Sequence, residues 1–367
     1  MRLLVLTSRY TASRDIIGED FGRQVRLFES LKKLGHEIDF LCADYKKFEN
    51  RNSELHGITV FIRPFSLAKS LSFLKNLKNL LKSKEYDFLI ATSDPLWGIF
   101  GRIYAKKRGI KFIYDLHDNY ETYASYRIPL LKYFDRHAVR HADIVTTVSF
   151  ALKEKISKIR KKNVFVVQNG VDLELFIPLE KKPSRKKLKL PLGSKIIVYT
   201  GSIQKTLGVD ILISAFQKIR KEIPDAKLLL VGRAAADNLN KKEIPDVKQQ
   251  GIISFDAVSQ QDVVLAINSA DVAAIPSPSN EFTKYCFPYK CVEYMACNTP
   301  IAATALGDVK LMLKDYKESL CEPGNGEELY KKIKIQLKKG KINYRRKLED
   351  YTWDKIALKL NKVFNLF

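Results

Sequence analysis

Short apolar runs alternate with amphipathic helical patterns along most of the chain, and this alternation limits the fold more than any other feature. In the first half the apolar runs lie at residues 2–7, 37–42, 86–92, 111–114, 144–148 and 164–167. The pattern restarts at residues 195–200 and continues at 227–231, 252–255, 272–275 and 300–303. Strands separated by helices form βαβ units with parallel pairing. The sequence therefore predicts an α/β fold built from two halves of similar size.

The length of 367 residues suits two domains, each large enough for its own core. A lysine-rich run bounded by prolines, residues 178–191, is typical of a linker between them. We predict a first domain over residues 1–175 and a second over 176–350. Residues 351–367 form a closing helix.

The composition excludes several classes of protein. The cysteines are odd in number and show no CxxC spacing, which argues against a disulfide framework or a zinc site and for a reducing compartment. The apolar N-terminal run is too short to span a membrane and lacks a cleavage site, so it is predicted to be a strand. These features predict a cytoplasmic protein.

The formal net charge of +23 favours anionic partners such as phosphates, acidic lipid headgroups or nucleic acid. A solvated surface rich in lysine explains the charge equally well. Because no nucleic-acid reading module is recognisable, we predict no specific nucleic-acid partner.

Residues 66–84 form a basic amphipathic pattern that could lie on an anionic membrane. Lys78 interrupts the apolar stripe, and a helix that packs its leucines on the sheet is the alternative. The stripe consists of Leu67, Leu71, Leu74, Leu77 and Leu81.

Polar side chains follow several predicted strands, where ligands of open parallel sheets bind. Glu293 lies early in a helix that Pro288 opens, and Lys290 lies in its first turn. A carboxylate there could accept hydrogen bonds from a ribose diol, and the first-turn N–H groups with Lys290 suit a phosphate. The alternative is that Glu293 only complements the helix dipole.

Two further positions in the first half are of interest. His117 and Asp118 come directly after the strand at 111–114, where a polar cluster is hard to explain as core. Gly22-Arg23 begins a helix and could approach an anion or a sugar, or could be a loop glycine beside a solvated arginine. The glycine spacing there is not that of a dinucleotide-binding loop.

These motifs together resemble glycosyltransferase family 4, a family of retaining, metal-independent enzymes. The resemblance runs over nearly the whole chain, and the order and spacing of the motifs carry it. They are the loop near Gly22, GHEID at 35–39, His117-Asp118, QNGVD at 168–172, YTGSI at 199–203, LLLVGR at 228–233 and EYMACNTPIAA at 293–303.

The resemblance implies a GT-B architecture, with two Rossmann-like domains facing each other across a cleft. The final helix is then expected to cross back to the first domain. A nucleotide-sugar donor, UDP- or GDP-linked, would bind mainly the second domain, and a glycan or lipid-linked acceptor the first. No cofactor or metal is implied. The family's role in cell-surface polysaccharide or glycoconjugate synthesis places such a protein in the cytoplasm or on the inner face of the membrane.

Five family positions can be carried over onto this sequence. Glu293 matches the glutamate that holds the donor ribose, and His117 the histidine near the transferring sugar, with Asp118 beside it. The remaining donor positions are Gly22 and Gly201, which approach the phosphates, and Arg233, which follows a strand that lines the nucleotide pocket.

The chain departs from the family pattern at Ser202, Leu207 and Tyr285, where arginine, lysine and glutamate are frequent. Lys205 and Lys290 are the candidate substitutes for the missing cations, and Ser202 stays a candidate donor contact. The alternative is a catalytically weak or non-catalytic protein that binds a nucleotide or glycan and supports a partner enzyme. An epimerase of the same shape fits the EYMA and NGVD runs less well.

Overall fold

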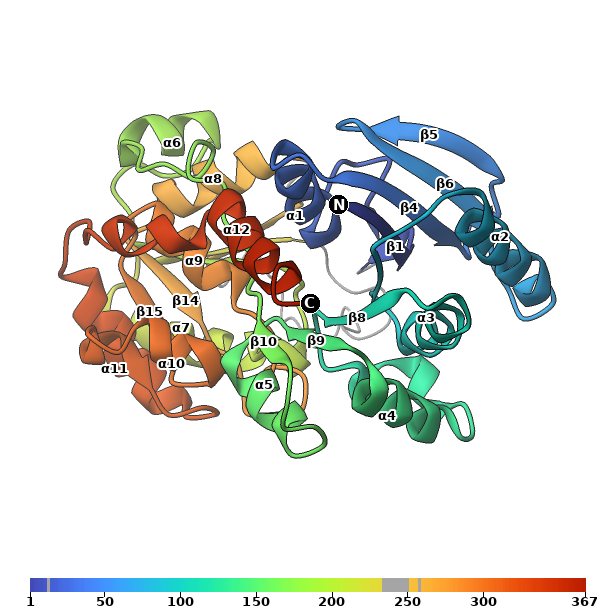
Figure 1. The fold of residues 1–367 in the computed structure, drawn as a ribbon. Coiled ribbons are helices and arrows are strands. Elements are labelled where there is room, and N and C mark those ends of the chain that lie inside the picture. Colours follow the sequence, from blue (N-terminus) through green and yellow to red (C-terminus); the bar gives the residue numbers. More distant parts are fainter. Residues whose placement is uncertain (12–13, 233–250, 257–258) are drawn as a thin grey trace. The chain divides into compact units, whose positions relative to one another are not determined.

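The computed structural model describes residues 1–11, 14–232, 251–256 and 259–367, which form two compact units. The first unit contains Met1–Gly170, Tyr285–Phe287 and Trp353–Phe367. The second contains Val171–Lys284 and Pro288–Thr352. Each unit is built on its own sheet (Figure 1). The α/β fold predicted from the alternation of strands and helices is confirmed.

The sheet of the first unit has eight strands in the order β10-β9-β8-β7-β1-β4-β6-β5. All neighbours pair in parallel except the edge strand β5, which is antiparallel to β6. The strands are β1 Arg2–Ser8, β4 Glu37–Asp44, β5 Arg51–Leu55, β6 Ile58–Pro64, β7 Phe88–Thr92, β8 Lys111–Leu116, β9 Ile144–Thr147 and β10 Val164–Val166. A small hairpin, β2 Tyr10–Thr11 with β3 Arg14–Asp15, follows β1.

Helices cover both faces of this sheet. Right-handed crossovers place α1 on one face, because it connects β1 to β4, and α2 to α5 on the other, because they connect strands in the opposite direction. The helices are α1 Arg23–Lys33, α2 Ser70–Ser83, α3 Pro95–Arg108, α4 Leu131–His141, α5 Phe150–Ser157 and α12 Trp353–Phe364, with short 3₁₀ turns at Tyr120–Thr122 and Ala124–Arg127.

The closing helix α12 packs beside α1 and completes the core of the first unit. Its apolar face, which includes Ile356, Leu360 and Phe364, is buried against the sheet and α1. Two polar contacts join the same helices: Ser30 Oγ donates to Asp354 at 2.8 Å, and His36 Nε2 lies 2.9 Å from Asn361 Oδ1. The last residues of the chain therefore belong to the unit that the first residues begin.

The second unit has a six-stranded parallel sheet in the order β13-β12-β11-β14-β15-β16. The strands are β11 Ile196–Thr200, β12 Lys227–Val231, β13 Ile252–Phe255, β14 Val272–Ile275, β15 Ile301–Thr304 and β16 Leu320–Cys321. The helices are α6 Lys181–Lys187, α7 Val209–Glu222, α8 Gln260–Ser269, α9 Tyr289–Ala296, α10 Gly307–Met312 and α11 Gly326–Leu337, with 3₁₀ turns at Lys205–Leu207, Lys317–Ser319, Arg345–Lys347 and Glu349–Tyr351.

The prediction of a linker at residues 178–191 is wrong. This run folds as α6, which packs against α8 inside the second unit. Arg185 is only 3% exposed and donates to Asp271 Oδ2 at 2.8 Å and to the Ser269 carbonyl at 2.9 Å. The lysines of the run lie on the solvated side of the helix. The buried Arg185, which binds the helix to the sheet, cannot be recognised from the composition.

The leucine pattern of residues 66–84 does not form one continuous stripe. Helix α2 begins at Ser70, and its buried residues are Phe73, Leu77 and Leu81, which pack within the unit. Leu67 precedes the helix and is 94% exposed, while Leu71 is 81% exposed. The packed half of the pattern is therefore part of the core. No helix within the described residues is long and apolar enough to cross a membrane.

Candidate active-site residues

The donor residues predicted in the second unit gather where the strand order of its sheet reverses. The crossovers run from β11 to β12 in one direction and from β14 to β15 in the other, so β11 and β14 are neighbours at the reversal. In open parallel sheets such a point leaves a crevice beyond the carboxyl ends of the strands. Gly201 follows β11 at this point, and Pro276 follows β14.

Two glycines let the backbone approach closely there. Gly201 has a φ of 111°, and a β-carbon built on it would lie 2.8 Å from Cε and 2.9 Å from Nζ of Lys290. Gly208 has a φ of 81°, and its β-carbon would meet the Pro276 carbonyl oxygen at 2.1 Å. Any other residue would be strained at both positions and would displace Lys290 or the loop after β14.

Lys290 is the cation that the fold places beside Gly201. Its Nζ lies 5.1 Å from the centroid of the Tyr199 ring, a cation–π distance. Among the described carboxylates, none forms an ion pair with Lys290. Helix α7 begins nearby at Val209, and no described side chain caps its N-terminus. The Lys290 ammonium and the uncapped backbone N–H groups of α7 together suit a diphosphate.

The other two residues predicted for this loop differ in their placement. Lys205 lies in an exposed 3₁₀ turn and makes no ion pair within the described part of the chain. Ser202 is exposed as well, and its carbonyl oxygen accepts a hydrogen bond from the Tyr199 hydroxyl at 2.9 Å. The structure therefore assigns the position beside Gly201 to Lys290 and not to Lys205.

Glu293 lies on the same face of α9 as Lys290, one turn further along. Glu293 is half-buried, and none of the described residues donates a hydrogen bond to its carboxylate. Burial raises the pKa of Glu293 to about 7, against the opposing effect of Lys290. The adjacent Tyr294 fixes the helix to β11, because its hydroxyl accepts from the Thr200 N–H at 2.9 Å. A held carboxylate without a partner can accept two hydrogen bonds from a diol.

His117 lies beyond β8 in the first unit, and its neighbours define its tautomer. Nδ1 lies 3.0 Å from both Thr92 Oγ1 and Tyr120 Oη. Thr92 donates its hydroxyl hydrogen to the Asp115 carboxylate, and Tyr120 donates its own to the Asp115 carbonyl, each at 3.0 Å. Both oxygens can then only accept, so Nδ1 carries the ring hydrogen.

The other ring nitrogen, Nε2, is therefore an acceptor. It is buried without a partner among the described residues. Burial lowers the pKa of His117 to about 4, so the ring is neutral at pH 7. His117 thus offers a lone pair to a hydroxyl group and no charge to a phosphate.

Asp118 is held by the 3₁₀ turn that follows it. Its carboxylate accepts from the Asn119 N–H at 2.8 Å and from the Tyr123 hydroxyl at 3.3 Å. Burial raises its pKa to about 6. At neutral pH it is an ionised acceptor beside His117.

Gly22 precedes α1 with a φ of 96°, which favours glycine, and no described side chain caps the helix. Arg23 fits neither of the two readings offered by the sequence. It is buried, and it donates to both oxygens of Asp115, at 3.2 and 2.9 Å, and to Asn169 Oδ1 at 2.9 Å. Arg23 therefore joins the strand ends that carry His117 and the QNGVD run.

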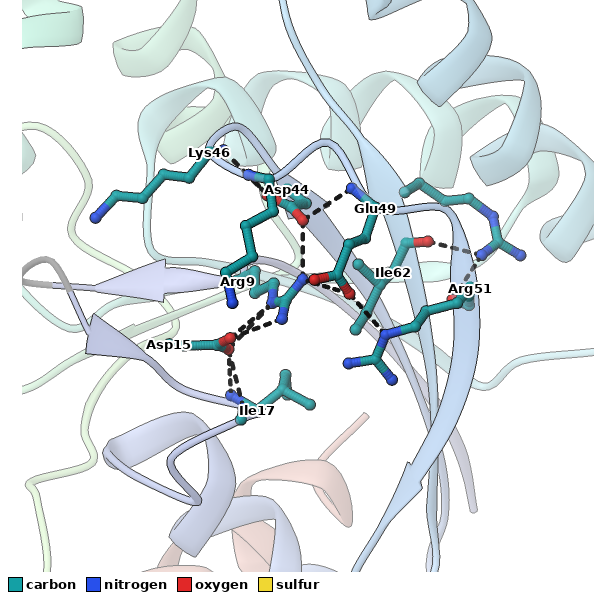
Figure 2. Close-up of polar contacts among 11 residues, drawn as sticks. Arg9, Asp15, Ile17, Asp44, Lys46, Glu49, Arg51 and Ile62 are labelled. Carbon is teal, nitrogen blue, oxygen red and sulfur yellow. Dashed lines mark hydrogen bonds and ion pairs between the residues drawn. The ribbon is translucent and has the colours of Figure 1, made fainter.

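Sequence reasoning missed a buried network centred on Arg9, at the end of β1 (Figure 2). Arg9 is 2% exposed and pairs with Asp15 at 2.7 Å, Asp44 at 2.9 Å and Glu49 at 2.9 Å. Asp15 in turn accepts from the Ile17 N–H at 3.2 Å. The network ties the loop leading to Gly22 to the loop after β4. Asp44 and Glu49 are far from Arg9 in the sequence, so no local signal pointed to the network.

Arg233 and Tyr285 are the other two residues that the sequence singled out. Arg233 lies outside the described residues. Tyr285 belongs to the first unit, where Lys155 Nζ lies 4.7 Å from its ring centroid. Within the described residues, no group of three or more histidine, cysteine, aspartate or glutamate side chains could hold a metal ion.

Two protein-family models match adjoining parts of the chain. One, described as Glycosyltransferase Family 4, matches residues 24–175, and the other, Glycosyl transferases group 1, matches residues 180–354. The chain belongs to glycosyltransferase family 4. The family and the enzyme class predicted from the sequence are confirmed.

Curated relatives match different shares of this family 4 chain. An uncharacterized glycosyltransferase, MJ1178 of Methanocaldococcus jannaschii, is 23% identical over 92% of this chain and 92% of its own length. The D-inositol 3-phosphate glycosyltransferase of Segniliparus rotundus is 28% identical over 42% of this chain. That match spans 34% of the Segniliparus protein, so the chain covers only about a third of this relative.

A solved structure shares the fold of both units. HepE of Anabaena, solved in complex with UDP, superposes with a TM-score of 0.77 and 17% identity over 100% of each chain. The same protein has been solved with UDP-glucose. The likeness establishes the GT-B fold that the sequence predicted.

Proposed function

We propose that the protein transfers a sugar from a nucleotide-sugar donor to a glycan or lipid-linked acceptor, with retention of configuration and without a metal. The observation that carries the proposal is the pairing of Lys290 beside Gly201 with the unpartnered Glu293 carboxylate, both at the reversal point of the second sheet. A nucleoside diphosphate presents the two chemistries that these groups recognise, a ribose diol and a phosphate chain.

The reaction needs stabilisation of the nucleoside diphosphate as it leaves. Lys290 and the N-terminus of α7 supply positive charge that is already in place, and pre-organised charge is an effective form of catalysis. We propose that they take the place of the cations that are missing at Ser202 and Leu207. This favours an active enzyme over the non-catalytic alternative.

The first unit supplies hydroxyl-recognising groups. His117 offers an acceptor through Nε2, and Asp118 adds an ionised carboxylate. We propose that these two side chains orient hydroxyl groups of the transferring sugar or the acceptor. We propose that a donor phosphate approaches Gly22 at the start of α1, where no described side chain caps the helix.

The donor is proposed to be a UDP-sugar, because HepE, which shares this fold, has been solved with UDP and UDP-glucose. GDP-sugars are the second choice. The proposed setting is the cytoplasmic synthesis of a cell-surface polysaccharide or glycoconjugate, at the inner face of the membrane.

The proposal can be tested with a panel of UDP-, GDP-, ADP- and dTDP-sugars, each with magnesium and with EDTA. A ligand that binds only the native state raises the melting temperature by mass action. We expect a selective shift that is independent of magnesium, followed by release of the nucleoside diphosphate when acceptor is supplied. Binding without turnover on any acceptor would support the non-catalytic alternative. No binding of any nucleotide sugar would contradict the proposed transferase and leave the non-catalytic, glycan-binding alternative.

A further inference from the structure

The start of α4 exposes an unusual density of large apolar side chains. Ile128 is 49% exposed, Leu130 70%, Tyr133 65% and Phe134 48%. Leu130 also has a φ of 63°, a left-handed conformation that leucine rarely adopts. Single exposed apolar residues need no explanation, but a contiguous group next to one helix end indicates an interaction site.

Cations surround these apolar side chains. A hollow of about 390 Å³ is lined by Leu130, Lys132, Tyr133, Arg136 and Arg140. Arg136 pairs with Glu121 at 3.2 Å, whereas Arg127, Lys132 and Arg140 have no acidic partner among the described residues. The surface therefore carries net positive charge that the unit itself does not neutralise.

The neighbouring helix α3 extends the positive charge. α3 packs against α4. The pKa of His137 on α4 is lowered by burial, by His141 and by the positive charges of Arg102, Lys106 and Arg140. Because α3 packs against α4, the cations of α3, among them Arg102 and Lys106, add to the positive charge near α4.

We propose that this surface, residues 127–140 with Arg102 and Lys106, docks on an anionic lipid bilayer. We refer to it as the α4 surface. Anionic headgroups neutralise the unpaired arginines and lysines, and the acyl boundary receives the apolar side chains. Tyr133 and Phe134 have the ring chemistry that concentrates at membrane interfaces.

A nucleic acid or an acidic protein segment fits the α4 surface less well. Either polyanion would satisfy the cations and could stack on the two rings. Neither would cover the aliphatic side chains of Ile128 and Leu130, which would stay in water. Apolar groups flanked by cations match a lipid surface, which offers both environments at once.

The α4 surface differs from the membrane segment that the sequence predicts. Phe73, Leu77 and Leu81 of α2 are buried in the core, so the exposed leucines of the segment are Leu71 on the helix and Leu67 before it. These two exposed leucines make a matched control, because they can be changed without disturbing packing.

The test uses flotation of the full chain with vesicles of phosphatidylcholine, alone or mixed with phosphatidylglycerol. The wild type is expected to bind only the mixed vesicles, and less at high salt. The triple variant Leu130→Ser, Tyr133→Ser, Phe134→Ser should lose at least about tenfold in partitioning. The variant Leu67→Ser, Leu71→Ser should bind within about twofold of the wild type.

A fluorescence readout locates the contact independently. The two native tryptophans, Trp97 and Trp353, are buried or partly buried, so Tyr133→Trp should dominate a blue shift on anionic vesicles. An unchanged far-UV circular dichroism spectrum and an unchanged melting transition of the first unit show that each variant is folded. Loss of the UDP-sugar thermal shift in the wild type and all variants would concern the proposed function alone.

Three results would overturn the proposal. The first is absence of wild-type binding to anionic vesicles at low salt. The second is a triple variant that binds anionic vesicles as well as the wild type does, or a Leu67→Ser, Leu71→Ser variant that loses as much binding as the triple variant. The third is tight binding of random duplex DNA that depends on Lys132 and Arg140 but not on the three apolar side chains.

Discussion

At the residue scale, the proposed donor site of the second unit depends on one lysine, whose position is set by its neighbours. Lys290 lies against the Tyr199 ring and beside Gly201, where a side chain would exclude it. Lys290 lies in the first turn of α9. The cations that are usual in the family lie instead in the loop after β11.

Replacing Lys290 should therefore reduce turnover more than it reduces stability. We expect Lys290→Gln to lower kcat by about 10²–10³, the range seen when one pre-organised charge or donor is removed. Lys290→Arg should keep part of the activity. Lys205→Gln is the control and should change kcat little. Steady-state kinetics with a UDP-sugar checks this, and a larger loss in the Lys205 variant would assign the role to that residue.

Glu293 should show a conflict between stability and binding. Because its pKa is raised to about 7, the folded protein binds more protons there than the unfolded chain between pH 4.5 and 7. Stability therefore falls as the pH rises through this interval. Glu293→Gln should stabilise the free protein at pH 8, by no more than about 3 kcal/mol.

The same substitution should weaken donor binding, because an amide offers one acceptor oxygen where a carboxylate offers two. In the wild type, donor affinity should fall as the pH drops below 7 and the carboxylate takes up a proton. The variant should lack this dependence. Calorimetric titration from pH 6 to pH 8 with UDP measures both effects, and parallel pH profiles for the two proteins would rule out a role for Glu293.

At the scale of elements, the loops after the strands of the first unit are held by charge as well as by packing. Arg9 neutralises three carboxylates, which lie on β3, at the end of β4 and in the loop after β4 (Figure 2). Burial alone would raise the pKa of Asp15, but hydrogen bonds from Arg9 hold it below its ordinary value. Removing the arginine would leave uncompensated buried charge.

Arg9→Met should destabilise the first unit by about 3–5 kcal/mol at pH 7. The loss should be smaller near pH 4, where the carboxylates become protonated in the variant. Arg51→Met is the matched control, since Arg51 also pairs with Glu49, at 2.7 Å, but is exposed. Its cost should stay below about 1 kcal/mol. Urea unfolding at both pH values checks the pair, and equal effects would contradict a buried network.

At the scale of the whole molecule, each of the two units is built from segments that are not consecutive in the sequence. Helix α12 ends the chain and yet completes the core that β1 begins. Leu360 is buried at the centre of this contact, whereas Leu358 on the same helix is 38% exposed.

Leu360→Ala should cost about 2–5 kcal/mol because it leaves a cavity in the core. Leu358→Ala should cost far less. A chain of two units can unfold in more than one transition. We expect the Leu360 variant to lower the transition that UDP does not stabilise, as monitored by calorimetry with and without UDP. A shift of the UDP-stabilised transition instead would place the helix energetically in the second unit.

Periodicity and short motifs were enough to predict the α/β class and the family, and they named Glu293, Lys290 and His117 as candidate site residues. These signals are local, because a strand end or a first helical turn is visible in neighbouring residues. Pairings between distant residues were not visible. The burial of Arg23 on Asp115, the Arg9 network and the choice of Lys290 over Lys205 all join segments far apart in the chain. The same reason explains the wrong linker prediction at residues 178–191 and the interrupted leucine stripe at residues 66–84. A run of lysines or leucines reports its average character, and only packing decides which side chains enter the core.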